Sequence, residues 1–360
     1  MYFLFGIFIL LAILGVLTPY FTRKTVVFGV TIPEQFLHDE RLKKFKRNYS
    51  VILASIAMVL GVTNSIIPML FSISEMTFVF ISLVIIYIMH ALSFALYFVY
   101  HVKTKQLRQR EGWGEKVRQV YVMDLSLRER DESLPIAFFG IPIVITLALI
   151  TYTYMYYNAI PDVFPSHWGP SGEPDAWTEK SLLSVVMLPL ILLGTQVFML
   201  VLAIGMKKSR MKLSVNEKEQ SSKRELGFRK YSSWYFALTI YTVTALMGFL
   251  HYTTMIQQNS DITAFLILFV AFNMLTLGGL IPYVLKVRSM NEKFETIHSN
   301  ETVADDDKYW KCGIFYINKE DTSFLVEKRF GTGWTLNFGN KWSYAVLLLT
   351  LLPLIIVFII

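Results

Sequence analysis

The chain has 360 residues, of which 54% are hydrophobic and only 17% are charged, and its formal net charge is +7. Because a soluble domain carries about 25% charged residues, this composition excludes an ordinary water-soluble protein. The single cysteine, Cys312, excludes an intrachain disulfide and a metal site with several thiolate ligands.

Eight uncharged segments are long enough to cross a bilayer core, which takes about 20 apolar residues in a helix. Helices are expected because unpaired strands would leave backbone polar groups unsatisfied in lipid. The sequence therefore predicts an all-α polytopic membrane protein with about eight transmembrane helices and a small β-rich cytoplasmic module before the last one. The predicted spans are 2–20, 51–71, 77–100, 136–157, 181–206, 232–256, 263–285 and 342–360.

Basic residues fall on one side of the predicted membrane. All 34 Lys and Arg residues except Lys180 lie in the first, third, fifth and seventh loops. Cytoplasmic loops are enriched in Lys and Arg, so we predict that these loops face the cytoplasm and that both termini lie outside. Since anionic lipid headgroups attract such cations, the expected partner of this charge is the lipid bilayer and not nucleic acid.

The cytoplasmic loops differ in their predicted structure. The first begins with a short extended piece, 25–33, and continues into a helix on the inner membrane surface with an apolar stripe. The fifth, 207–231, mixes Lys, Arg and Glu without an apolar face, which is typical of a solvated helix. The stretch 310–338 alternates apolar residues with turn residues, which indicates a β-rich unit. The residues of the apolar stripe are Phe36, Leu37, Leu42 and Phe45.

The predicted organisation has four parts. The first, 1–100, holds three spans and the basic loop 21–50. The second, 101–285, holds the next four spans and the external loop 158–180. The cytoplasmic tail module, 286–341, follows, and the last span, 342–360, ends the chain.

The fourth loop is the long external one and concentrates unusual residues. Five prolines or glycines between Pro165 and Pro174 predict a compact, ordered loop. Two interpretations of this loop stay open. Its tryptophans could anchor it at the lipid interface, or its side chains could converge on a peptide, a cation or a metal. Because no zinc-binding spacing is present, we predict no metal site. The candidate residues are His167, Trp168, Glu173, Asp175 and Trp177.

The predicted spans contain no Asp, Glu, Lys or Arg, which argues against an ion-coupled transporter. Their polar side chains are expected to form hydrogen bonds between helices. Histidine changes charge near neutral pH, so the two intramembrane histidines are also candidates for a functional role. The intramembrane polar residues are Asn64, His90, Gln196, His251 and Asn273.

No phosphate-binding loop, no Ser-His-Asp order and no paired intramembrane carboxylates occur in the sequence. We therefore predict no catalytic residue and no cofactor. An enzyme is left as the third interpretation.

The external loop resembles the domain of unknown function that begins the SdpI-type bacterial immunity proteins. A proline-rich entry is followed by His, an aromatic residue, Gly, Glu, Pro, Asp, an aromatic residue and Lys. Gly169 replaces the usual Asn. The matching residues are Pro161, Pro165, His167, Trp168, Gly172, Glu173, Pro174, Asp175, Trp177 and Lys180.

Two further stretches are similar to longer members of this family. Residues 28–33 read Phe-Gly-Val-Thr-Ile-Pro, and the tail from Asp305 to Asn337 resembles a second uncharacterised module that is often appended. In that module Lys319 and Thr322 replace common prolines.

The resemblance implies a non-catalytic receptor or immunity protein of the bacterial cell membrane. It would sense or resist an extracellular peptide and communicate with a cytoplasmic regulator. The whole matching pattern in the external loop, Gly172, Pro174 and Lys180 included, would form the ligand site. The alternative from a different class is a transporter or permease.

Overall fold

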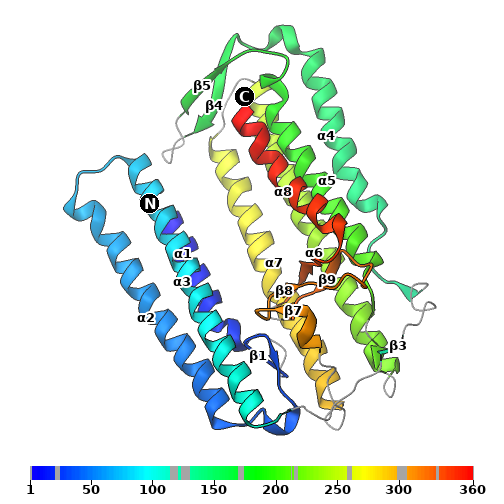
Figure 1. Cartoon of the computed structure of the whole chain (residues 1–360). Coiled ribbons are helices and arrows are strands. Elements are labelled where there is room, and N and C mark those ends of the chain that lie inside the picture. Colours follow the sequence, from blue (N-terminus) through cyan, green and yellow to red (C-terminus); the bar gives the residue numbers. More distant parts are fainter. Residues whose placement is uncertain are drawn as a thin grey trace. The chain divides into compact units, whose positions relative to one another are not determined.

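The computed structural model describes residues 2–20, 25–113, 121–122, 130–168, 174–211, 213–214, 218–257, 262–297, 306–329 and 332–359. Within these residues eight α-helices form at the eight predicted positions (Figure 1). The predicted all-α polytopic fold is confirmed. The helices are α1 (Tyr2–Leu17), α2 (Glu40–Leu70), α3 (Glu75–Arg110), α4 (Ala137–Met155), α5 (Met187–Lys208), α6 (Lys218–Tyr252), α7 (Ile262–Ile297) and α8 (Lys341–Ile359).

Six helices in the described part of the chain, α2 to α7, are long and apolar enough to cross a membrane. The chain is therefore an integral membrane protein with several spans. With 16 residues, α1 is shorter. The side chains of α8 are described only as far as Thr350, and this helix is not among the six.

The strands are short and form two-stranded sheets. They include the antiparallel pairs β1–β2, β3–β6, β4–β5 and β7–β8, together with the pair β9–β10. Strand pairs in the tail confirm the predicted β-rich character of 310–338. The strands are β1 (Val26–Val27), β2 (Val30–Thr31), β3 (Tyr121–Val122), β4 (Val163–Trp168), β5 (Pro174–Glu179), β6 (Leu213–Ser214), β7 (Trp310–Lys311), β8 (Phe315–Tyr316), β9 (Leu325–Glu327) and β10 (Trp334–Leu336).

The chain divides into two compact units. Unit 1 contains Met1–Val120, Asn291–Tyr316 and Glu327–Gly333. Unit 2 contains Tyr121–Met290, Ile317–Val326 and Trp334–Ile360. The tail thus contributes to both units, and the four-part organisation stays a prediction.

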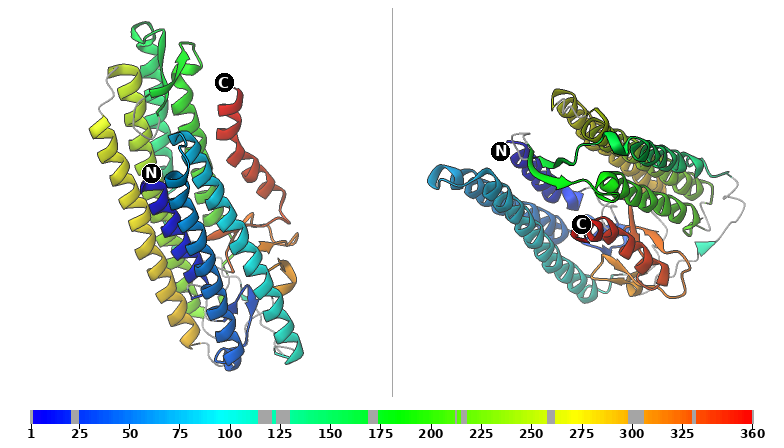
Figure 2. Two further views of the ribbon diagram at one scale, coloured as in Figure 1. Left: turned by 90° about the vertical axis from the view of Figure 1, so that its left-hand side faces the viewer. Right: turned by 90° about the horizontal axis from the view of Figure 1, so that it is seen from above.

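Unit 1 is built on the helices α1, α2 and α3, which contact one another (Figure 2). The β1–β2 hairpin places Phe28 in a buried aromatic cluster, where its ring stacks on Tyr100 with a centroid distance of 5.3 Å. Phe28 and Gly29 at the turn have φ of 46° and 75°, the left-handed conformations that a tight hairpin turn requires. The expected extended piece is therefore a hairpin.

The prediction of a separate surface helix after this hairpin is wrong for the described residues. A 3-10 turn, Glu34–Phe36, comes first, and α2 then runs without a break into the membrane span. Asp39 caps α2 by accepting from the Arg41 backbone N–H at 2.8 Å. The Arg41 guanidinium holds the pKa of the Asp39 carboxyl below its usual range. Leu42 lies in the Phe28 cluster, and the other three residues of the predicted apolar stripe pack against this cluster. The stripe is therefore apolar because it faces the core of unit 1.

In unit 2, α4, α5 and α6 contact one another and α8 packs on α5 (Figure 2). Residues of the fifth predicted loop are helical from Lys218 onward, as expected. They are not solvated as predicted, because Arg224, Glu225, Phe228 and Arg229 are buried. The Phe228 ring is buried because it stacks on Trp334. Arg229 is buried because its guanidinium donates hydrogen bonds to backbone carbonyls at the end of α5.

Part of the tail packs against the helices of unit 2. The Trp334 ring stacks on Phe228 of α6 with a centroid distance of 5.0 Å. Phe324 lies against α5 at Gly205, where a Cβ atom would come within 2.3 Å of the ring. These two tail residues are therefore held against α5 and α6 by aromatic contacts.

Candidate functional site

The loop between α4 and α5, which the sequence predicts to be external, forms the β4–β5 hairpin (Figure 1). Val163 pairs with Glu179, and Pro165 pairs with Trp177. The Lys180 backbone N–H donates to the Asp162 carbonyl at 2.8 Å and closes the base. The predicted compact loop thus contains an antiparallel strand pair, whose register shifts at two places between Pro165 and Trp168.

The inner face of the hairpin is fixed to the ends of the helices by an apolar cluster. Phe164 is only 3% exposed and packs with Ile160, with Val185 and Val186 before α5, and with Met255 in a π-helical turn, Thr253–Gln257. Burying a large aromatic side chain is worth about 1.5–3 kcal/mol. This contact holds the hairpin in place against the helices.

The outer face carries the recognition candidates. Side chains alternate along a strand, so Trp177 and Glu179 share the face of β5 opposite to the cluster. A second register shift, between His167 and Trp168, leaves Asp175 unpaired on β5 and outside this alternation. The Trp177 side chain is 59% exposed. A large exposed aromatic side chain on a rigid hairpin is a typical anchor for a protein or peptide partner.

A β-bulge brings the histidine and one carboxylate together. The strand register shifts between Pro165 and His167, and bulges re-aim the side chains that follow them. As a result, His167 Nδ1 lies 2.5 Å from Asp175 Oδ1. The Asp175 carboxylate can accept a hydrogen bond from this ring nitrogen.

Among the residues that match the family pattern, Lys180 lies at the base of the hairpin and not on its outer face. Its Nζ donates to the Ile160 carbonyl at 2.7 Å and lies 3.6 Å from Asp162 Oδ1. It also lies 5.0 Å from the centre of the Tyr157 ring. The ammonium group therefore ties the base of the hairpin together.

The remaining loop residues are placed only in part. Pro174 pairs with Trp168 next to the turn, and nothing is described of the Trp168 side chain. Gly172 and Glu173 lie outside the described residues. Of the predicted set, the structure brings His167 and Asp175 into contact and places Trp177 on the same strand as Asp175.

The intramembrane polar residues fall into two groups. Three of them bond between helices, as predicted: Asn64 accepts from Ser82 at 3.0 Å, Gln196 donates to Thr146 and Thr244, and His251 contacts Thr153. The other two bond within their own helix: His90 contacts the Ile86 carbonyl, and Asn273 donates to the Phe269 carbonyl.

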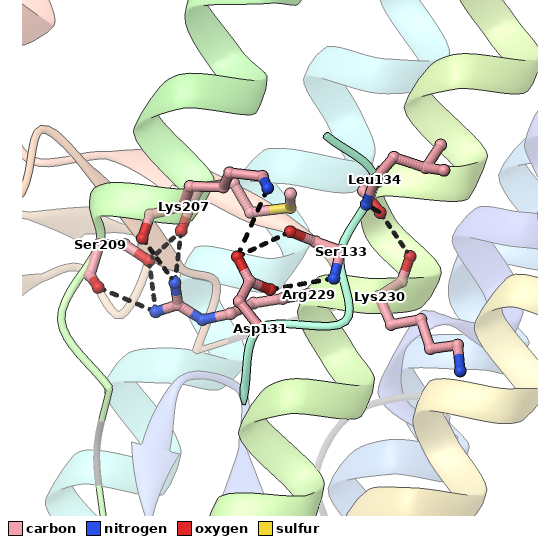
Figure 3. A network of polar contacts seen from close by, with 9 residues as sticks. Asp131, Ser133, Leu134, Lys207, Ser209, Arg229 and Lys230 are labelled. Carbon is pink, nitrogen blue, oxygen red and sulfur yellow. Dashed lines mark hydrogen bonds and ion pairs between the residues drawn. The ribbon is translucent and has the colours of Figure 1, made fainter. Parts of the chain in front are cut away.

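A polar junction that the sequence did not indicate centres on Arg229 of α6 (Figure 3). Arg229 is fully buried. Its Nη1 donates to the Met206 and Lys207 carbonyls at 2.8 and 2.9 Å, and its Nη2 donates to the Ser209 carbonyl at 2.8 Å. The guanidinium thus satisfies the last carbonyls of α5, where a positive charge also complements the helix dipole.

The segment before α4 joins the same junction (Figure 3). The Asp131 carboxylate accepts from the Ser133 backbone and hydroxyl at 3.0 and 2.8 Å and lies 3.6 Å from Lys207 Nζ. The Leu134 N–H donates to Ser233 Oγ at 3.0 Å. These residues come from three segments distant in the sequence, so no short motif could have revealed them.

Two families of unknown function match the chain. The domain of unknown function DUF1648 matches residues 137–193, which run from the start of α4 through the hairpin into α5. The family of unknown function DUF5808 matches residues 319–344 in the tail. No curated protein and no solved structure matches the chain. Similarity to an uncharacterised domain is thereby confirmed for the loop between α4 and α5 and for its flanking helices.

Proposed function

We propose that this protein is a non-catalytic receptor or immunity protein of the bacterial cell membrane. It recognises an extracellular peptide on the β4–β5 hairpin. The observation that carries the proposal is the exposed Trp177 side chain on the outer face of this hairpin, together with the His167–Asp175 pair that joins its two strands. Rigid loops are where recognition residues are usually held.

Two further observations support it. The DUF1648 match covers the hairpin and its flanking helices, in agreement with the resemblance to SdpI-type proteins. The distribution of Lys and Arg favours a cytoplasmic location for the opposite ends of the helices. A cytoplasmic regulator would therefore meet the basic loops and the tail.

The chemistry of the hairpin favours a cationic peptide. Asp162, Glu173, Asp175 and Glu179 lie in the external loop, whereas Lys180 is its one basic residue. Because Lys180 Nζ is held at the hairpin base, its charge is not presented on the outer face. Complementary charge accelerates and orients association, and salt screens it.

The proposal is tested by challenging a deletion strain with culture supernatants of related strains. We expect at least one supernatant to inhibit the deletion strain more than its parent, and the wild-type gene to restore protection. Asp175→Asn should weaken protection at unchanged membrane abundance, and added salt should reproduce part of this loss. Equal growth of both strains in every supernatant would contradict the proposal. Fully protective hairpin variants beside an inactive His251→Ala variant would favour a transporter.

A further inference from the structure

The interior of the α4–α5–α6 bundle carries polar side chains at two levels. At the Gln196 level, Gln196 of α5 meets Thr146 of α4 and Thr244 of α6. At the His251 level, His251 of α6 meets Thr153 of α4. On both α4 and α6 the two levels are seven residues apart. This spacing is two helical turns, or roughly 10.5 Å.

Gln196 leaves one end of its amide without a partner. It is fully buried, and its Nε2 donates to Thr146 Oγ1 at 2.7 Å and to Thr244 Oγ1 at 3.0 Å. Its Oε1 has no hydrogen-bond partner among the described residues. Rotating the amide by half a turn exchanges the two ends, so one end stays unsatisfied in either orientation.

His251 is in the same position with its second ring nitrogen. It is 1% exposed, and its Nε2 lies 2.7 Å from Thr153 Oγ1. Thr153 also donates to the Leu149 carbonyl at 2.9 Å. A hydroxyl has one proton, so Nε2–H is the donor to Thr153, and the Nδ1 lone pair finds no donor in the described part of the chain.

A third atom of this kind lies one turn further toward the hairpin. Thr254 is 9% exposed, and its Oγ1 also lacks a partner among the residues described. Thr254 follows His251 by three residues and lies in the π-helical turn Thr253–Gln257. One water molecule, with hydrogen bonds of about 2.8 Å on either side, spans about 5.6 Å between two partners.

Such groups are costly in a membrane, because a buried polar group without a hydrogen bond costs roughly 2–7 kcal/mol and lipid offers no donor. In folded proteins, buried water satisfies groups of this kind. We propose that the α4–α5–α6 interior is a binding site for water at both levels. One molecule donates to Gln196 Oε1, and another donates to His251 Nδ1 and bonds to the Thr254 hydroxyl.

The distance between the two levels also determines which ligands can bind there. The two levels are roughly 10.5 Å apart, whereas a single water molecule spans about 5.6 Å through two hydrogen bonds. The levels therefore hold separate molecules. The same separation is too great for one metal ion, whose ligands lie about 2.0–2.6 Å from it.

The site is tested by solid-state NMR on the full-length protein in liposomes, with ¹⁵N-labelled histidine and glutamine side chains. Magnetisation is transferred from water protons to the side-chain nitrogens. We expect the ring nitrogens of His251 and the amide of Gln196 to receive at least half of the signal that His167 on the exposed hairpin receives. A His251→Phe variant assigns the resonance, and the measurement itself uses the wild-type protein.

Two results would overturn the inference. If His167 receives magnetisation from water but His251 and Gln196 receive none, the α4–α5–α6 interior contains no water. A Gln196→Leu variant separates the levels, because the His251 signal should persist in it. Its loss would show that the two levels do not hold separate water molecules.

Discussion

At the scale of single residues, one asparagine organises the tail in unit 2. Asn337 is fully buried, and its Nδ2 donates to the carbonyls of Asn318, Asp321 and Ser323 at 2.9, 3.0 and 3.0 Å. Its Oδ1 accepts from the backbone N–H of Asn318 and of Gly339, both at 3.0 Å. One side chain thus holds a segment that has little regular structure of its own.

Asn337→Asp should therefore be strongly destabilising. The substitution keeps the shape but places a carboxylate oxygen against three carbonyl oxygens. Each unsatisfied buried group costs about 1–3 kcal/mol, and we expect a clear loss in thermal stability of the purified protein. Asn340→Asp is the matched control, because the half-buried Asn340 side chain donates to one carbonyl, that of Thr322, and its Oδ1 already caps α8 by accepting from the Trp342 backbone N–H. Equal effects of the two variants would contradict the role given to Asn337.

Arg229 and Lys230 are adjacent cations with different surroundings. Arg229 is fully buried and bonds to three backbone carbonyls, whereas Lys230 forms an exposed ion pair with Glu132 at 2.7 Å. Arg229→Met should cost about 3 kcal/mol or more, because it leaves buried carbonyls unpaired. Lys230→Met should cost less than about 1 kcal/mol. Comparable denaturation midpoints for the two variants would refute this distinction.

At the scale of the elements, the sequence predicted the hairpin's compactness but not its strands. Pro165 and Pro174 are unfavourable in the middle of a sheet. Both are tolerated because the sheet has only two strands. The bulge that joins His167 to Asp175 depends on the strand register, which no single residue determines. In contrast, the helices were predicted well, because each span is a long apolar segment.

The packing of Phe324 on α5 gives a test at this scale. A Cβ atom at Gly205 would meet the Phe324 ring, whereas a Cβ atom at Gly248 on α6 would have its nearest neighbour at 4.0 Å. Gly205→Ala should cost about 1–3 kcal/mol by overpacking and speed protease cleavage of the tail. Gly248→Ala should be neutral or stabilising, because alanine is the better helix former by roughly 1 kcal/mol. A protease-resistant tail in Gly205→Ala would contradict this packing.

At the scale of the whole molecule, hydropathy predicted a multi-pass protein, and six helices confirm it. The sequence could not predict how the tail contributes to two units, because its contacts join residues far apart in the chain. Nor could it predict the Arg229 junction or the polar levels, since each depends on how separate helices face one another.

Membrane orientation stays a prediction at this scale. In a Cys312→Ser background, a cysteine at exposed Ser166 on the hairpin should react with an impermeant thiol reagent in intact cells. A cysteine at exposed Lys223 on α6 should react only after the membrane is opened. The opposite pattern would reverse the assignment of the hairpin to the outside.

The central claim is that the hairpin, through its exposed aromatic side chain, is the recognition site. Trp177 on the hairpin and Trp342 at the start of α8 are 59% and 62% exposed, so they form a matched pair. The decisive measurement is the protection against an inhibitory supernatant at equal membrane abundance. Trp177→Ala should lose at least tenfold in protection, also at high salt, since a central aromatic anchor is worth about 2 kcal/mol or more. Trp342→Ala should protect like the wild type, and full protection by Trp177→Ala would contradict the claim.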